Sequence, residues 1–169
     1  SLHCPLTPET TGLIGEADET APSGGRPSKL LKVNETFALT LAADIGESII
    51  RVVITSLEPR ILAEITFPNS FDIAPETTLR EIMVQGEQLL AGLGRKKRDL
   101  LGVGLSLPAP VDYDNALVVG PSVMRGWDGF DIRGWFRENH AIRMFADNDV
   151  NLMAFAEQRA HWPDEDSFF

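Results

Sequence analysis

Three runs rich in β-branched and other apolar residues follow one another in the first half of the chain. They cover residues 37–45, 48–57 and 61–68, and they are separated by Gly46-Glu47 and Glu58-Pro59. Connections this short favour antiparallel neighbours, because a parallel pair needs a long crossover. This part of the sequence therefore predicts three antiparallel strands.

The next segment has the pattern of an amphipathic helix. Its apolar residues recur at helical spacing and define one face: Leu79, Ile82, Met83, Leu89, Leu90 and Leu93. Pro75 lies near the expected start, and Thr78 with Glu81 fits a capping box. Gly92 and Gly94 are expected to end the helix.

After this helix, apolar runs of strand length alternate with helical patterns. Residues 100–107 and 142–146 are typical of strands buried on both faces of a parallel sheet. A short strand is expected at residues 116–119, and helices are expected at 132–139 and 150–161. The order βββαβ(β)αβα predicts an α/β fold with a ribonuclease-H-like layout.

The first 36 residues differ from the rest of the chain. They contain four Pro and four Gly, and no helical periodicity survives among them. Two short apolar pieces, residues 12–17 and 28–33, flank the loop Ser23-Gly24-Gly25-Arg26-Pro27. A small hairpin and a flexible arm are both compatible with this pattern.

The charge balance limits the partners of this chain. It has 15 Lys and Arg against 25 Asp and Glu, a net charge of −10. Such a surface repels a phosphate backbone at long range, so tight binding of nucleic acid by this chain alone is not expected. The one basic cluster, Arg95-Lys96-Lys97-Arg98, is interpreted as a solvated turn.

Other features of the composition point to a soluble, cytoplasmic protein. No segment reaches the roughly 20 apolar residues of a membrane span, and no signal peptide opens the chain. Cys4 is the single cysteine, which excludes a disulfide framework. His3, His140 and His161 have no metal-ligand spacing, so no metal site is expected.

Two polar segments lie at expected strand ends, where α/β sheets bind ligands. Asp44-Ile45-Gly46-Glu47-Ser48 could hold a metal–phosphate group, but an ordinary hairpin turn is favoured and Glu47 would repel phosphate. Asp147-Asn148-Asp149 could supply a general base and a hydrogen-bonding amide, or simply cap a helix. Residues 108–112 also follow a strand and could line the same crevice.

Taken in order, these segments resemble motifs of the ROK family, named for repressors, open reading frames and kinases. Residues 44–49 are similar to the family's Asp-Ile-Gly-Gly-Thr-Lys, and residues 102–112 to its Gly-Val-Gly-…-Pro-Gly-Pro-Val-Asp. Gly126-Trp127-Asp128-Gly129 resembles its Gly-Trp element, and Asn148-Asp149-Val150-Asn151 its Asn-Asp-Ala-Asn. The resemblance covers about residues 37–158.

The leading segment resembles the winged-helix end of ROK repressors. In that resemblance Gly24, Gly25, Arg26 and Pro27 correspond to the wing used near the DNA minor groove. It implies that residues 1–36 are a remnant of the wing plus a linker. Residues 37–169 are then the first lobe of an actin-like ATPase or sugar-kinase-like region. The major-groove helices, the second lobe and the family's zinc motif are expected outside this chain.

The resemblance implies a sugar- or sugar-phosphate-responsive transcriptional repressor rather than an enzyme. Its sugar ligands in this chain would be Ala109, Ser122, Asn148 and Asp149. The implied partners are a carbohydrate or sugar-phosphate inducer, operator DNA through the helix-turn-helix, and further copies in a homo-oligomer. This chain alone is expected to be monomeric or weakly associated, with exposed apolar surface where the second lobe belongs.

The phosphate loop departs from the family pattern. Asp44, Gly46 and Ser48 are kept, but Glu47 replaces the second glycine and Ile49 the lysine. No cofactor is therefore expected in this chain. The alternative is an ATP-dependent sugar kinase, in which Asp149 is the general base and the Asp44 loop holds Mg-ATP; a purely structural lobe is the third possibility.

Overall fold

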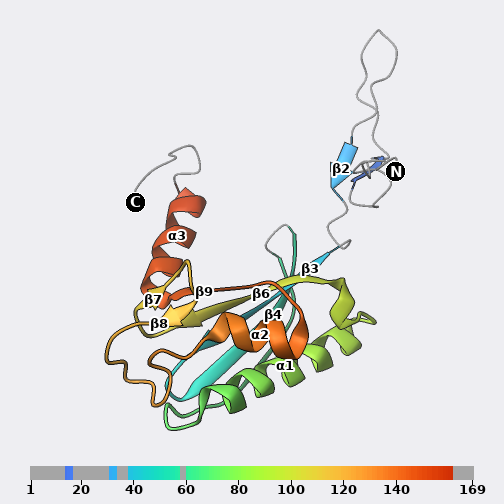
Figure 1. Cartoon of the computed structure of the whole chain (residues 1–169). Helices are drawn as coiled ribbons and strands as arrows, with labels where there is room; N and C mark the ends of the chain where they lie inside the picture. Colours follow the sequence, from blue (N-terminus) through green and yellow to red (C-terminus); the bar gives the residue numbers. More distant parts are fainter. Residues whose placement is uncertain (1–13, 17–30, 34–37, 58–59, 162–169) are drawn as a thin grey trace, which may run out of the picture.

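The centre of the molecule is a five-stranded sheet in the order β5-β4-β3-β6-β9 (Figure 1). The computed structural model describes residues 14–16, 31–33, 38–57 and 60–161. β3 (Leu39–Ile45), β4 (Ile49–Ser56) and β5 (Ile61–Pro68) are antiparallel neighbours, whereas β6 (Leu100–Leu107) and β9 (Met144–Asn148) run parallel to β3. The predicted α/β order and the antiparallel strands are confirmed.

The N-terminal segment contains a second, smaller ladder. β1 (Ile14–Glu16) pairs antiparallel with β2 (Leu31–Val33), and Ile14 is opposite Val33. Of the two alternatives for this segment, the pairing supports the hairpin. The loop that carries Gly24, Gly25, Arg26 and Pro27 lies outside the described residues.

The first long helix, α1 (Pro75–Gly92), begins without a side-chain cap. Its N-cap is Ala74, and Pro75 occupies the first helical position. The fixed φ of proline suits that position, and its missing N–H is one of the donors that would lack a helical partner anyway. The predicted capping box is therefore wrong, because Thr78 lies inside the helix and is buried.

The end of α1 agrees with the prediction. Gly94 has φ +70°, and its N–H donates to the carbonyl oxygen of Ala91 at 3.0 Å. The N–H of Arg95 donates to the carbonyl oxygen of Leu90 at 2.8 Å, which completes a Schellman motif. A glycine is needed here because other residues rarely adopt this left-handed conformation.

The remaining elements precede or follow β6 and β9 along the chain. They are the short helix η1 (Lys97–Asp99), the hairpin β7 (Val111–Asp112) with β8 (Leu117–Val118), and the helices α2 (Ile132–His140) and α3 (Asp149–His161). β9 begins two residues later than predicted, because Ala141 ends α2 with φ 50° and the parallel register starts at Val103 and Met144. None of the helices in the described part of the chain is long and apolar enough to cross a bilayer.

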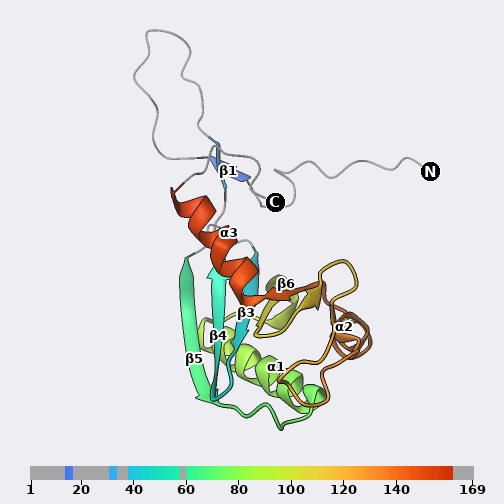
Figure 2. The ribbon, with the colours of Figure 1, turned by 90° about the vertical axis from the view of Figure 1, so that its left-hand side faces the viewer.

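The hydrophobic core lies between one face of the sheet and the helices α1 and α2 (Figure 2). Residues of β3 alternate: Leu39, Leu41, Ala43 and Ile45 are buried in this core, while the intervening residues face the other side. Gly86 of α1 brings the helix against β3, since a Cβ there would lie 2.1 Å from Cδ1 of Leu41.

The opposite face, here called the outer face, is only partly covered by other described residues, among them Tyr113 and Leu152. Leu101 of β6 and Phe145 of β9 are each 54% exposed on it. No side chain of α3 is buried, although its exposed residues include Val150, Met153 and Phe155. The prediction that β6 and β9 are buried on both faces is therefore wrong for the described part of the chain, where a single helical layer covers the sheet.

Candidate functional site

The turn between β3 and β4 is a tight hairpin. The N–H of Gly46 donates to the carbonyl oxygen of Ile49 at 3.0 Å, and a Cβ on Gly46 would lie 2.8 Å from that oxygen. Only glycine allows this approach. Asn69 Nδ2 donates to the carbonyl oxygen of Gly46 at 2.7 Å, so the turn is also tied to the end of β5. Glu47 and Ser48 are exposed at its tip.

The charges at this turn are unfavourable for a triphosphate. Asp44 and Glu47 place two carboxylates there, and Ile49 carries no charge. Arg51 on β4 forms an ion pair with Glu64, and this hydrogen-bonded carboxylate raises the pKa of the Arg51 guanidinium. The one cation of this strand is thus already paired. A triphosphate would meet negative charge from Glu47 here, with no free cation on β4 to offset it.

The end of β9 is joined to the turn after β6 by Asn148. Its Nδ2 donates to the carbonyl oxygen of Ala109 at 3.0 Å, and its Oδ1 accepts from the N–H of Val150 at 2.9 Å. Because α3 begins at Asp149, the second bond is an N-cap. The predicted neighbourhood of Asn148 and residues 108–112 is present, and the amide has a structural role as well.

Asp147 and Asp149 stand on either side of this amide. Oδ1 of Asp147 accepts from the N–H of Asn148 at 2.7 Å and from Nδ2 of Asn151 at 3.0 Å. Oδ1 of Asp149 accepts from the N–H of Val150 at 2.8 Å. Both residues are half-buried at the start of α3. The helix N-terminus, with its unpaired N–H groups, favours a negative charge at this point.

The turn after β6 is held by the β7–β8 hairpin. Asp112 accepts hydrogen bonds from the side chain of Asn115 at 2.7 Å and from its N–H at 3.1 Å, which lowers the pKa of the Asp112 carboxyl. Arg133 of α2 donates to the carbonyl oxygen of Asp114. Asp112 therefore stabilises the hairpin turn itself.

Ser122 lies in the loop that follows β8. Its Oγ donates to the carbonyl oxygen of Met124 at 3.0 Å, and its N–H donates to Oδ1 of Asp128 at 3.0 Å. Among the described residues, no hydrogen bond joins Ser122 to Asn148 or Asp149. The structure thus brings Ala109, Asn148 and Asp149 together directly, whereas Ser122 is held in its own loop.

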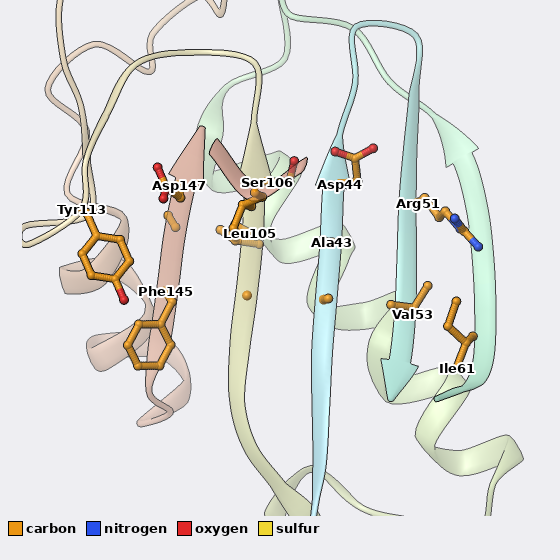
Figure 3. Close-up of a pocket in the computed structure, with 14 residues that line it drawn as sticks. Ala43, Asp44, Arg51, Val53, Ile61, Leu105, Ser106, Tyr113, Phe145 and Asp147 are labelled. Carbon is orange, nitrogen blue, oxygen red and sulfur yellow. The ribbon is translucent and has the colours of Figure 1, made fainter. Parts of the chain in front are cut away.

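A cavity of about 420 Å³ lies on the outer face beside this site (Figure 3). At its polar end, Ser106 on β6 is paired with Asp44 on β3 and with Asp147 on β9, and all three side chains line the cavity. Two strand spacings separate the carboxylates by about 10 Å. Tyr113 and Phe145 contribute aromatic rings, and Leu152 of α3 lies on the rim.

Sequence reasoning did not single out Ser106 or Tyr113 for this site. Ser106 could have been identified from the alternation of side chains along β3 and β6. Ser106 lies two residues after Gly104 and is paired with Asp44, so both side chains are on the same face of the sheet. Tyr113 reaches the cavity only through the β7–β8 hairpin, which no local pattern predicted. In the part of the chain that the structure describes, no cluster of His, Cys, Asp and Glu could hold a metal ion.

Comparison with known protein families gives a match to one family. The model of the ROK family matches residues 40–165 of the chain. A glucokinase from Halalkalibacterium halodurans is 23% identical over 117 residues, which are 69% of this chain and 35% of that protein.

Two solved structures have the same fold. The crystal structure of a ROK family transcriptional regulator, a homologue of the E. coli MLC protein, superposes with a TM-score of 0.70 at 19% identity and covers 94% of this chain and 40% of its own. The ROK hexokinase from Thermus thermophilus has a TM-score of 0.59 at 21% identity and covers 72% of this chain and 38% of its own. This chain spans between 35% and 40% of the length of these relatives.

Proposed function

Because the chain belongs to the ROK family, we propose that it is part of a transcriptional regulator that responds to a sugar or a sugar phosphate. One observation carries the choice between regulator and kinase. The structural similarity to the regulator extends over 94% of the chain, whereas the similarity to the hexokinase extends over 72%. A share of 94% must include most of residues 1–36. The paired strands β1 and β2 belong to this additional segment.

The β3–β4 turn supports the same choice. A kinase must hold the phosphates of ATP, yet this turn presents Asp44 and Glu47 without a free cation among the described residues around it. Repulsion between a triphosphate and these carboxylates would have to be overcome before any binding energy is gained. We propose that the lobe binds no ATP.

The ligand in this proposal is held at the end of β9. Asp149 accepts hydrogen bonds from two sugar hydroxyls, and the backbone at Ala109 and the amide of Asn148 form the adjacent wall. Ser122 would reach the sugar only from the neighbouring loop. Hydrogen bonds to a charged group contribute roughly 1.5–3 kcal/mol each, so one carboxylate can dominate the affinity.

In this proposal the whole protein binds its operator through a helix-turn-helix, and the segment around Gly24, Gly25, Arg26 and Pro27 acts as the wing beside it. Sugar binding at β9 would then change the position of this segment relative to the lobe. The operator would be released as a result. The operator is bound by a homo-oligomer, because symmetric operators call for symmetric proteins.

The test uses the whole protein and DNA that it selects itself from a random-sequence library. The selected DNA is titrated with hexoses and hexose phosphates, and release is followed by fluorescence anisotropy. Asp149→Asn should keep the DNA affinity of the wild type but need about 10- to 100-fold more sugar for release.

Asp147→Asn is the matched control, because Asp147 is hydrogen-bonded to Asn148 and Asn151 and is not assigned to the sugar. It should respond to sugar like the wild type. Failure to select any DNA, or transfer of phosphate from ATP to a hexose by the wild-type protein, would overturn the regulator and favour the kinase.

A further inference from the structure

The Lys and Arg residues of this acidic protein are not spread evenly over the lobe. Five of them gather at the amino ends of the parallel strands: Arg95, Lys96, Lys97, Arg98 and Arg143. We call this group the basic edge. The first four lie between the end of α1 and the start of β6, and Arg143 directly precedes β9.

The sheet register places these positions toward one edge of the sheet, with Arg143 level with Gly102, four residues after Arg98. β6 and β9 are adjacent and parallel, so the residues before them emerge at the same edge. Lys97 Nζ donates to Nδ1 of His140 at 2.6 Å, which joins the run before β6 to the end of α2. Lys96, Arg98 and Arg143 are exposed, and no ion pair engages them among the described residues.

Acidic groups near the basic edge are few. Asp99 accepts a hydrogen bond from the N–H of Lys96, and Glu87 lies 3.9 Å from Lys97. By contrast, Asp44, Glu47, Asp147 and Asp149 are all at the carboxyl ends of the strands. A strand of eight residues separates the two edges by about 25 Å, which is several Debye lengths at physiological salt. The net negative charge therefore does not cancel the local positive potential.

The basic edge also lies where the N-terminal segment joins the lobe. Leu39, the first residue of β3, pairs with Leu100, the first residue of β6. β2 ends at Val33, and the six steps from there to Leu39 span at most about 21 Å. The paired strands β1 and β2 are thus within one turn of B-DNA, about 34 Å, of the basic edge.

We propose that the basic edge is a second DNA contact, which binds the phosphate backbone beside the site occupied by the N-terminal segment. This inference rests on the proposed regulator function. The contact is independent of base sequence, since Lys and Arg side chains neutralise phosphates and release counterions. It gives the acidic lobe one surface that duplex DNA can approach.

The experiment measures binding of the whole protein to a mixed-sequence 30-base-pair duplex over a range of salt concentrations. The edge variant combines Lys96→Gln, Arg98→Gln and Arg143→Gln. Its control combines Arg80→Gln, Arg125→Gln and Arg159→Gln, three exposed residues from elsewhere on the lobe. Both variants lose three positive charges, so a difference between them reports position rather than net charge.

The edge variant should bind about 10- to 500-fold more weakly at 100 mM salt, and its salt slope should fall by about 2.7, or 0.9 for each phosphate that is no longer neutralised. The control should stay within about threefold of the wild type, because its charges are distant from the duplex. Equal binding by the two variants would overturn the proposal. So would binding of the wild type to vesicles with anionic lipids but not to the duplex.

A further variant, Arg26→Ala, separates this inference from the proposed function. If Arg26→Ala weakens DNA binding while the edge variant matches its control, the regulator function stands and the basic edge is not a DNA contact. If the wild-type protein binds its selected DNA but not the mixed-sequence duplex, only the basic-edge proposal fails; if it binds neither, both proposals fail together.

Discussion

Asn148 donates a hydrogen bond from its Nδ2 to the carbonyl oxygen of Ala109 over 3.0 Å, and thereby links the end of β9 to the turn after β6. The same side chain caps α3 through Val150. One amide thus connects two strands and a helix at the place where the sugar site is proposed. Loss of this side chain should affect the geometry of the site as well as the stability of the lobe.

Asn148→Ala should lower the free energy of unfolding by about 1–3 kcal/mol, because it removes an N-cap and a partly buried hydrogen bond. Asn148→Asp should lower it less, since the carboxylate can still cap α3 and only the bond to Ala109 is removed. Urea unfolding measures both. Asn151→Ala, which removes one exposed bond to Asp147, is the control and should cost under about 0.5 kcal/mol. An equal cost for Asn148→Ala and Asn151→Ala would contradict the linking role.

Gly86 allows α1 to lie close to β3. Gly86→Ala should destabilise the lobe by about 1–3 kcal/mol, because its Cβ would overlap Cδ1 of Leu41, which is fully buried. The gain in helix propensity, up to about 1 kcal/mol, offsets this only in part. Gly92→Ala meets no atom within 4 Å and should be neutral or slightly stabilising. Thermal unfolding of the two variants decides the matter, and a stabilised Gly86→Ala protein would show that the helix can move away.

His140 should make stability depend on pH. Burial first, and then the charge of Lys97, lower the pKa of His140, whose Nδ1 accepts from Lys97 Nζ and is therefore unprotonated. The folded state thus disfavours the charged form. Its contribution to stability is complete above pH of about 6.5, the ordinary value in the unfolded chain, and it is lost as the pH falls below that value.

The melting temperature should accordingly decrease between pH 7 and pH 5, and His140→Gln should decrease less over the same range. His161→Gln, in which the replaced ring is exposed on α3, serves as the control and should keep the slope of the wild type. A wild-type slope in His140→Gln would mean that other groups cause the pH dependence.

The residues of the β3–β4 turn lead us to expect that the protein does not bind ATP. Calorimetry with Mg-ATP on the whole wild-type protein should give no binding heat, because Glu47 repels the phosphates and Ile49 supplies no positive charge. The double variant Glu47→Gly, Ile49→Lys removes one carboxylate and adds a cation at an exposed position, so any nucleotide affinity should appear there first. Tight binding of ATP by the wild type would show that the lobe has a nucleotide site, contrary to this prediction.

Local patterns predicted most of the elements of this fold. The short turns at residues 46–47 and 58–59 indicated antiparallel strands, and the helical spacing of apolar residues indicated α1. These features depend on neighbours in sequence, and their physical causes act within one turn or one strand. The failed capping box at Thr78 had a local cause too: Pro75 begins the helix without a side-chain cap.

The site depended on contacts between distant residues. Asn148 and Asp149 were identified from the sequence as candidates, but the bond from Asn148 to Ala109 crosses 39 residues and requires the parallel register of β6 and β9. The same register brings Ser106 between Asp44 and Asp147. Neither spacing nor composition contains this information, because strands that pair in parallel are joined by a whole crossover.

The basic run was visible in the sequence as an isolated cluster, and there its most economical interpretation was a solvated turn. The sequence by itself determined the α/β order, the polar strand ends and the net charge. Only the tertiary structure decided that Arg143 joins Arg95–Arg98 at one edge, that the carboxylates collect at the other, and that the outer face of β6 is exposed. The physical reason is that parallel pairing collects the ends of strands far apart in the chain, and charge acts over the distance between side chains rather than along the sequence.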